Sequence, residues 1–310
     1  MPTQPALELL PEATDNPHVA RVLRTFSDGI RETFSFGTHV LKWCAEAGRG
    51  GDETSELWLL FRHALELLDS IAILVRQSSV EPCKALLRCL LEVLYFAEYI
   101  LRADTTRRAK CLLVWDIRNT LNHYECMAPT TQRGKQLRQI VGKGRYGKRV
   151  VLREPPELQE RIRNLQILLA KPEYAEVDAE YERLRAARMR NPAWYALFGG
   201  PTKVESLAAK VGLSDTYEIL YRHWSGTVHA TDVRKGKISS SGGRAAIHQI
   251  RLPTAAQEVT FYSLSLAFPL YRAFIRHYVP LRQVDYSDWY KAEVRDLYLR
   301  LAGPQIIAVD

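Results

Sequence analysis

Apolar residues recur at helical spacing along most of the chain, and almost no segment alternates as a strand would. The run from Leu57 to Ile71 shows this clearly, with apolar side chains three or four positions apart. Polar residues such as Asn16, before Pro17, mark the helix starts. The pattern predicts helices over residues 17–47, 55–77, 79–102, 104–127, 155–170, 172–189, 202–211, 214–229, 254–278 and 285–301.

The fold class that follows is all-α, an antiparallel helical bundle in one domain over residues 1–310. Short turns between consecutive helices favour antiparallel neighbours. We therefore expect the core bundle to combine residues 17–127 with residues 202–301. Residues 128–154 are expected to form an inserted basic loop, and residues 155–190 an exposed helical hairpin rich in Glu and Arg.

Positive charge is concentrated in one segment of the chain. Lys and Arg total 43 against 35 Asp and Glu, which gives a net charge of +8. Residues 129–153, called here the cationic segment, hold eight basic residues and no acid, so the remaining charges balance. The glycines in this segment predict a loop, with a short strand hairpin at 148–152, and a polar loop is expected again at 231–243.

The cationic segment has two interpretations. It can follow a phosphate backbone, which makes RNA or another polyanion the expected partner. Alternatively, it is a solvated insertion that keeps the protein soluble. The residues expected to bind nucleic acid are Arg133, Lys135, Arg138, Lys143, Arg145, Lys148 and Arg149.

Nothing in the sequence predicts export, membrane insertion or a cofactor. Residues 1–17 contain no Lys or Arg, and the longest uncharged apolar stretch, 259–271, is shorter than the ~20 residues that span a bilayer. The five cysteines are odd in number and form no Cys-x-x-Cys pair, which favours a cytoplasmic location. The sequence shows no cluster of Cys and His, no cluster of carboxylates and no Gly-rich phosphate loop, so neither a metal nor a cofactor is expected.

A charged pair interrupts an otherwise apolar segment near residue 90. Arg88 and Glu92 are four positions apart and share a helix face among Leu and Tyr residues. A charge that leaves water must be paired or neutralised. Two interpretations stay open: an ion pair that fixes helix packing, or a polar site inside the bundle.

Tyr221, Ser225 and His229 follow one another at intervals of four and therefore share a helix face. Arg222 lies two turns before His229, near the same face. Histidine can carry a proton near neutral pH, and arginine can hold a phosphate. The alternative is a core histidine bonded to a tyrosine. No Asp stands at a spacing typical of a catalytic triad, which disfavours Ser225 as a nucleophile.

The sequence RNTLNH at residues 118–123 is the third candidate. Asn119 and His123 share a helix face, whereas Arg118 lies about 140° away and needs its long side chain to reach it. A ribonuclease that works without metal needs a proton carrier and a cation for the scissile phosphate, and this hexapeptide contains both. The alternative is an ordinary polar helix face.

Several segments resemble a bacterial family of all-helical proteins that has no established activity. The likeness spans about residues 55–235 and rests on ALLRCLLE (85–92), NPAWY (191–195) and LYRHWSGTVH (220–229). In that family the Arg…Glu pair and the Tyr…Ser…His helix occur together. The resemblance implies that the two groups converge on one site.

A looser resemblance is to the HEPN superfamily, helical bundles that are often dimeric and include metal-independent ribonucleases of toxin and antiviral systems. Their motif is an Arg, commonly followed by Asn, with a His after four to six intervening residues. Both Arg118…His123 and Arg222…His229 fit this spacing. The resemblance implies a metal-independent endoribonuclease, a homodimer, and a protein partner from a defence or toxin operon. The alternative is a non-catalytic helical module that binds nucleic acid, a small anion or a protein.

Overall fold

A computed structural model describes residues 6, 9–10, 16–47, 54–145, 149, 153–187, 191–229, 231, 234, 237–241 and 244–307. The chain divides into two compact units, one made of Met1–Ala103 with Val204–Asp310 and the other of Asp104–Lys203. Helices dominate both units, which confirms the predicted all-α class. None of the described helices combines the length and the apolar character needed to cross a membrane.

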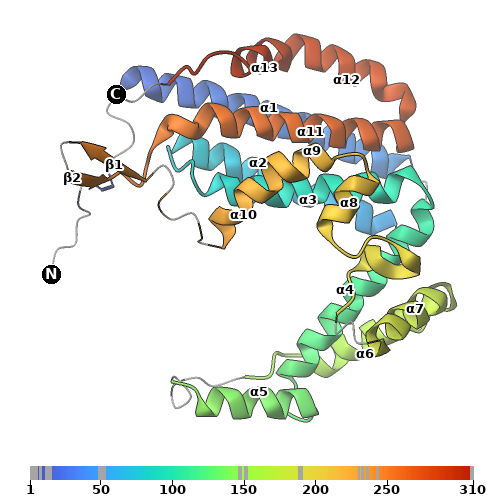
Figure 1. The fold of residues 1–310 in the computed structure, drawn as a ribbon. Helices are drawn as coiled ribbons and strands as arrows, with labels where there is room; N and C mark the ends of the chain where they lie inside the picture. Colours follow the sequence, from blue (N-terminus) through green and yellow to red (C-terminus); the bar gives the residue numbers. More distant parts are fainter. Residues whose placement is uncertain are drawn as a thin grey trace. The chain divides into compact units, whose positions relative to one another are not determined.

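Four long helices surround the core of the first unit (Figure 1): α1 (Pro17–Glu46), α2 (Thr54–Arg76), α3 (Cys83–Arg102) and α11 (Ala256–Tyr278). Both α1 and α3 pack on α2 and on α11, so the four helices close around one apolar interior. The fourth side of this bundle is α11 rather than the helix that follows α3 in the chain. The reason is that α11 buries side chains on most of its surface, among them Val259, Leu264 and Phe274, and must be enclosed by other helices.

The closest approach in this bundle is at Gly37 of α1. A Cβ atom at Gly37 would lie 2.4 Å from Tyr271 Oη and 2.5 Å from Leu65 Cδ2, so only glycine fits between α2 and α11. The buried Tyr271 hydroxyl donates a hydrogen bond of 3.0 Å to the Thr33 carbonyl, one turn earlier on α1. Shape and hydrogen bonding therefore hold α1 and α11 in one register.

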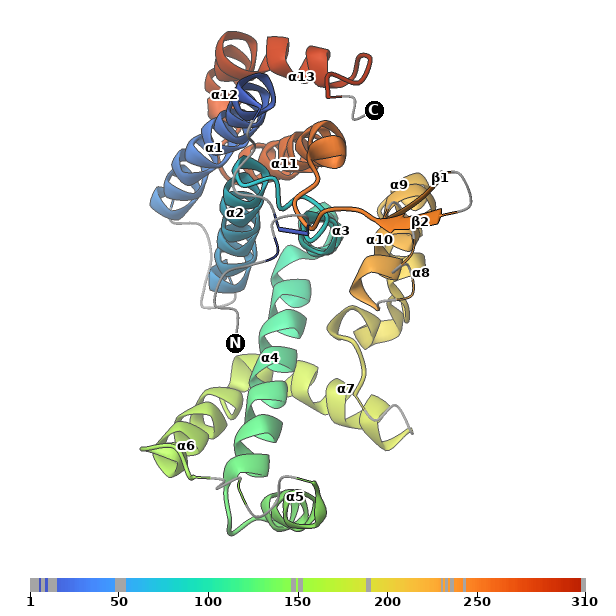
Figure 2. The same cartoon turned by 90° about the vertical axis from the view of Figure 1, so that its left-hand side faces the viewer.

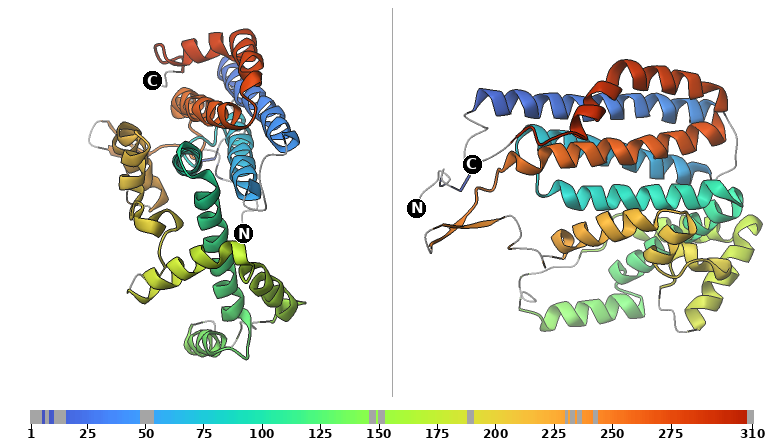
Figure 3. Two further views of the ribbon diagram at one scale, coloured as in Figure 1. Left: turned by 90° about the vertical axis from the view of Figure 1, so that its right-hand side faces the viewer. Right: turned by 45° about the horizontal axis from the view of Figure 1, so that its top comes forward.

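Shorter helices cover two sides of the bundle (Figure 3). The C-terminal helices pack on α1 and α11, where Phe36 stacks on Trp289 with ring centroids 4.0 Å apart. These C-terminal elements are α12 (Gln283–Trp289), η6 (Tyr290–Val294) and α13 (Arg295–Leu301). The elements that cover α3 are α8 (Val204–Lys210), α9 (Ser214–Thr216), the π-helical turn η3 (Tyr217–Tyr221) and α10 (Arg222–Val228).

The second unit is organised around one central helix, α4 (Thr105–Met127), visible in Figure 2. The helices α5 (Gln132–Lys143), α6 (Leu158–Leu169) and α7 (Ala175–Ala186) each pack on it, as does the turn η2 (Trp194–Gly199). Thus α6 and α7 occupy the segment expected as a helical hairpin. The sequence analysis placed α4 in the core bundle. In the structure α4 belongs to the second unit, where the other helices of that unit pack on it.

The cationic segment is not the loop that its glycines suggested, because residues 132–143 form α5. Thr131 caps this helix, and its hydroxyl accepts a hydrogen bond of 3.0 Å from the Gly134 N–H. Gln, Lys, Leu and Arg supply enough helix propensity to outweigh the two glycines inside it. The strand hairpin expected at 148–152 lies outside the described residues. A hairpin of β1 (Ile238–Ser241) and β2 (Arg244–Ile247) instead overlaps the expected polar loop.

We predict that Gly37→Ala lowers the free energy of unfolding by about 1–3 kcal/mol, because the new methyl group overpacks the junction of α1 with Leu65 and Tyr271. Urea denaturation measures the change. Gly142→Ala is the matched control, since no atom lies within 4 Å of its added Cβ and alanine favours helix. The control should gain about 0.5–1 kcal/mol. Equal effects of the two substitutions would contradict the close-packing argument.

Candidate functional site

Arg88, Glu92 and Tyr221 form one polar cluster on the surface of α3. Arg88 Nη2 and Glu92 Oε1 are 3.1 Å apart, and their side chains are only 18% and 29% exposed. The Tyr221 hydroxyl joins both: it accepts a hydrogen bond of 2.6 Å from Arg88 Nη2 and donates one of 2.8 Å to Glu92 Oε1. The ion pair expected from the sequence is therefore present, and a tyrosine from a distant segment completes it.

The π-helical turn η3 brings Tyr221 to this position. A π turn contains one extra residue and is often found at functional sites. The Tyr217 and Tyr221 rings, at its two ends, stack with centroids 4.9 Å apart. The Arg88 guanidinium carbon lies 4.5 Å from the centroid of the Tyr221 ring, within range of a cation–π interaction. The ring and the hydroxyl of Tyr221 thus both hold Arg88.

The electrostatics of the cluster make Tyr221 a hydrogen-bond donor. Burial raises the pKa of Tyr221 to about 12, and the hydrogen bond to Glu92 contributes in the same direction. The hydroxyl therefore stays protonated at neutral pH and cannot act there as a base. Arg88 Nε is buried and has no hydrogen-bond partner among the described residues, so this guanidinium has one unused donor.

Ser225 and His229 do not join this cluster. The Ser225 hydroxyl donates a hydrogen bond of 2.6 Å to the Tyr221 carbonyl on its own helix, which satisfies the hydroxyl locally. His229 is the residue that ends α10, and its side chain is exposed. Arg222 is also exposed and pairs with Glu218 at 2.9 Å. The predicted convergence thus holds for Arg88, Glu92 and Tyr221, while His229 lies beyond them.

Arg118 belongs to a separate ionic cluster in the second unit. Its Nε and Nη2 donate to both carboxylate oxygens of Asp178, at 2.7 and 2.6 Å, and Nη1 lies 2.9 Å from Glu182. Two acids from α7 therefore neutralise this arginine. Asn119 is half-buried on α4, and His123 is exposed on it. The contacts of Arg118 with α7 favour the structural interpretation of the 118–123 sequence.

The described cations of the cationic segment differ in their contacts and in their exposure. Arg138 donates to the Met127 carbonyl at 2.9 Å and so caps the end of α4. Arg133 donates to Asn122 Oδ1, a neutral oxygen. Lys135, Lys143 and Arg149 are exposed, as is Arg145. Lys148 lies outside the described residues.

Other reactive groups are scarce in the part of the chain that the structure describes. Burial raises the pKa of Cys44, Cys83 and Cys111 to about 12, so these thiols remain protonated and are poor nucleophiles. Among the described residues, no three His, Cys, Asp or Glu side chains gather as metal ligands. The absence of a metal or cofactor in the protein's chemistry stays a prediction.

Sequence reasoning missed the partners that lie far apart in the chain. Tyr95 and Thr216 share a hydrogen bond of 2.9 Å one turn from the cluster, and burial raises the pKa of Tyr95. The exposed hairpin predicted for residues 155–190 gave no indication that Asp178 and Glu182 of α7 contact Arg118. No local spacing could have identified either set, because each depends on which helices pack together.

Residues 57–236 match the profile of DUF5677, described as a family of unknown function. The match covers more than half of the 310 residues and includes the whole Arg88–Glu92–Tyr221 cluster. No curated protein and no solved structure matches the chain. The expected membership of a helical family without an established activity is thus confirmed, and nothing here supports the HEPN resemblance.

We predict that Tyr221→Phe lowers the free energy of unfolding by about 1–3 kcal/mol at neutral pH, because Arg88 and Glu92 lose the hydroxyl of a buried partner. The folded pKa of about 12 exceeds the unfolded value of about 10. The stabilisation by this hydroxyl is therefore complete below pH ~10 and is lost as the pH rises towards 12.

Urea denaturation of both proteins near neutral pH and at alkaline pH measures this difference. Tyr217→Phe is the matched control, because Tyr217 stacks in the same turn and its hydroxyl takes no part in the cluster. A wild-type advantage over Tyr221→Phe that grows with pH would show that the hydroxyl does not stabilise the fold as a proton donor.

Proposed function

This chain belongs to the DUF5677 family, and we propose that it binds RNA by holding the phosphate backbone on its cationic segment. One observation carries the proposal: the segment presents exposed Lys and Arg side chains and contains no acid. The hydrogen bonds from Arg133 and Arg138 go to neutral oxygens, so these bonds do not neutralise the charges of the two guanidinium groups.

The helix α5 spaces these cations suitably for a chain of phosphates. Lys135 and Lys143 are exposed and eight residues apart, which corresponds to about 12 Å along a helix axis. Each can therefore meet a different phosphate. Binding of this kind releases counterions and weakens steeply with salt.

We predict that neutralising Lys135, Lys143 and Arg149 together, each to Gln, weakens binding of single-stranded RNA and reduces the salt slope by about 2, since each lost phosphate contact removes about 0.7. Fluorescence anisotropy over a salt series measures both quantities. The matched control neutralises Arg21, Arg24 and Arg31, three exposed cations of α1. Equal losses for the two triple variants would mean that binding follows net charge and not this segment.

A second candidate function is metal-independent RNA cleavage of the HEPN type. Arg222 and His229 support it, because both are exposed and stand at the two ends of α10, Arg222 as its first residue and His229 as the residue that caps its end. His229 would take the proton from a ribose 2′-hydroxyl as the 2′ oxygen attacks the phosphorus. The bond to the 5′ oxygen breaks, this oxygen takes a proton from water, and a 2′,3′-cyclic phosphate forms. Arg222 would stabilise the charge that develops on the phosphate. A homodimer, a defence or toxin partner and a cytoplasmic location stay predictions.

We predict that the wild-type protein cleaves single-stranded RNA in the presence of EDTA, and that His229→Ala lowers the rate at least ~100-fold, as expected for loss of a general acid–base group. Product gels and single-turnover rates measure this. His123→Ala is the control and should cleave normally, because Arg118 beside it is already neutralised by two acids. Intact RNA with wild-type protein would leave RNA binding as the sole function.

A further inference from the structure

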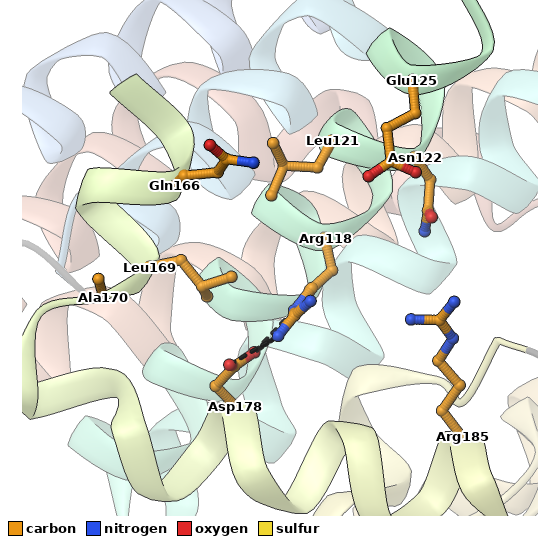
Figure 4. Close-up of a pocket in the computed structure, with 9 residues that line it drawn as sticks. All are labelled: Arg118, Leu121, Asn122, Glu125, Gln166, Leu169, Ala170, Asp178 and Arg185. Carbon is orange, nitrogen blue, oxygen red and sulfur yellow. Dashed lines mark hydrogen bonds and ion pairs between the residues drawn. The ribbon is translucent and has the colours of Figure 1, made fainter. Parts of the chain in front are cut away.

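A cavity of about 280 Å³ lies between α4, α6 and α7 in the second unit (Figure 4). Leu121 and Leu169 provide apolar surface, the amides of Asn122 and Gln166 provide neutral polar groups, and the carboxylates of Glu125 and Asp178 provide hydrogen-bond acceptors. The Arg118 guanidinium also lines it, with Gln166 and Arg185 on opposite sides in the view of Figure 4. A small planar molecule with polar edges suits such a lining.

The contacts of the Arg118 guanidinium suit it to stacking against a ligand rather than to binding a phosphate. Asp178 and Glu182 occupy donors at Nε, Nη1 and Nη2 along the guanidinium edge. These contacts fix the orientation of the planar group and neutralise its charge. The Tyr181 ring centroid lies 5.9 Å from the guanidinium carbon on one side, and the group also lines the cavity. Unstacked RNA bases pack on planar guanidinium groups.

The amides supply the directional contacts that a base edge requires. Asn122 Oδ1 already accepts a hydrogen bond from Arg133, so the Asn122 Nδ2 amide remains as a donor. Gln166 is exposed on α6 and contributes both a donor and an acceptor. The Arg133 contact also links the cavity to the cationic segment, because Arg133 belongs to α5.

We propose that this cavity binds one unstacked nucleobase of an RNA strand whose phosphates lie on the cationic segment. The inference rests on the proposed RNA binding and adds that the protein contacts a base as well as the backbone. The base stacks beside Arg118 and Leu169, and the two amides meet its edge. The cavity assigns a role to Arg118 that differs from catalysis: it positions and stacks a base.

The test compares two labelled oligomers of equal length, a single-stranded RNA of mixed sequence and an abasic ribose-phosphate strand, on the full chain by fluorescence anisotropy. We expect the wild-type protein to bind the base-containing strand at least about fivefold more tightly. Ala170→Trp, which fills the cavity from the end of α6, should remove this preference and leave binding of the abasic strand unchanged. Gln166→Ala should reduce the preference without adding bulk.

Ile167→Trp is the matched control, because Ile167 is 61% exposed on the same helix and does not line the cavity. It should retain the wild-type preference, and circular dichroism should show equal helix content in all variants. Equal binding of the two strands by wild-type protein, or a preference that survives Ala170→Trp, overturns the base-binding inference and leaves backbone binding intact. Failure of wild-type protein to bind either strand at low salt overturns both proposals.

Discussion

The first unit depends on how α3 accommodates two charges. This helix packs on α2, α11 and α10, and most of its side chains are buried. Arg88 and Glu92 therefore cannot both be hydrated fully, and a half-buried charge without partners would cost several kcal/mol. The Tyr221 hydroxyl of η3 forms a hydrogen bond with each of them, and these two bonds replace hydrogen bonds that water would otherwise make. This requirement sets where η3 must sit along α3.

Arginine has three different roles in the protein, and its surroundings decide each of them. Arg88 is held between a carboxylate and an aromatic ring, Arg118 is neutralised by two acids, and Arg138 caps carbonyl groups. The exposed cations of the cationic segment, by contrast, have no acid within their own segment and direct their charge into solvent. Charge counting alone treats all of them alike. Burial and the chemistry of the partner distinguish a packing residue from a binding residue.

Local patterns and packing contributed differently to what could be predicted. The 3.6-residue period located α1, α2, α3 and α11 within a few residues, because an amphipathic stripe is a local property. The loop predicted from the glycines of the cationic segment was wrong, because Thr131 caps residues 132–143 and the helix propensity of the remaining residues makes them the helix α5. The spacing of Tyr221, Ser225 and His229 predicted one shared helix face, whereas Tyr221 lies in η3, Ser225 in α10 and His229 just after the end of α10. It could not reveal that Ser225 bonds to its own backbone or that the helix ends before His229.

By itself, the sequence determined the all-α class, the positions of the long helices, the spacing that puts Arg88 and Glu92 on one face of α3, and the concentration of positive charge at 129–153. The tertiary structure alone decided that α11 closes the bundle, that the Tyr221 hydroxyl bonds to both Arg88 and Glu92 without Ser225 or His229, and that Asp178 neutralises Arg118. The physical reason is range. Helix periodicity, capping and charge are set by neighbours within a few residues, whereas these three contacts depend on side-chain fit between segments that are distant in the chain.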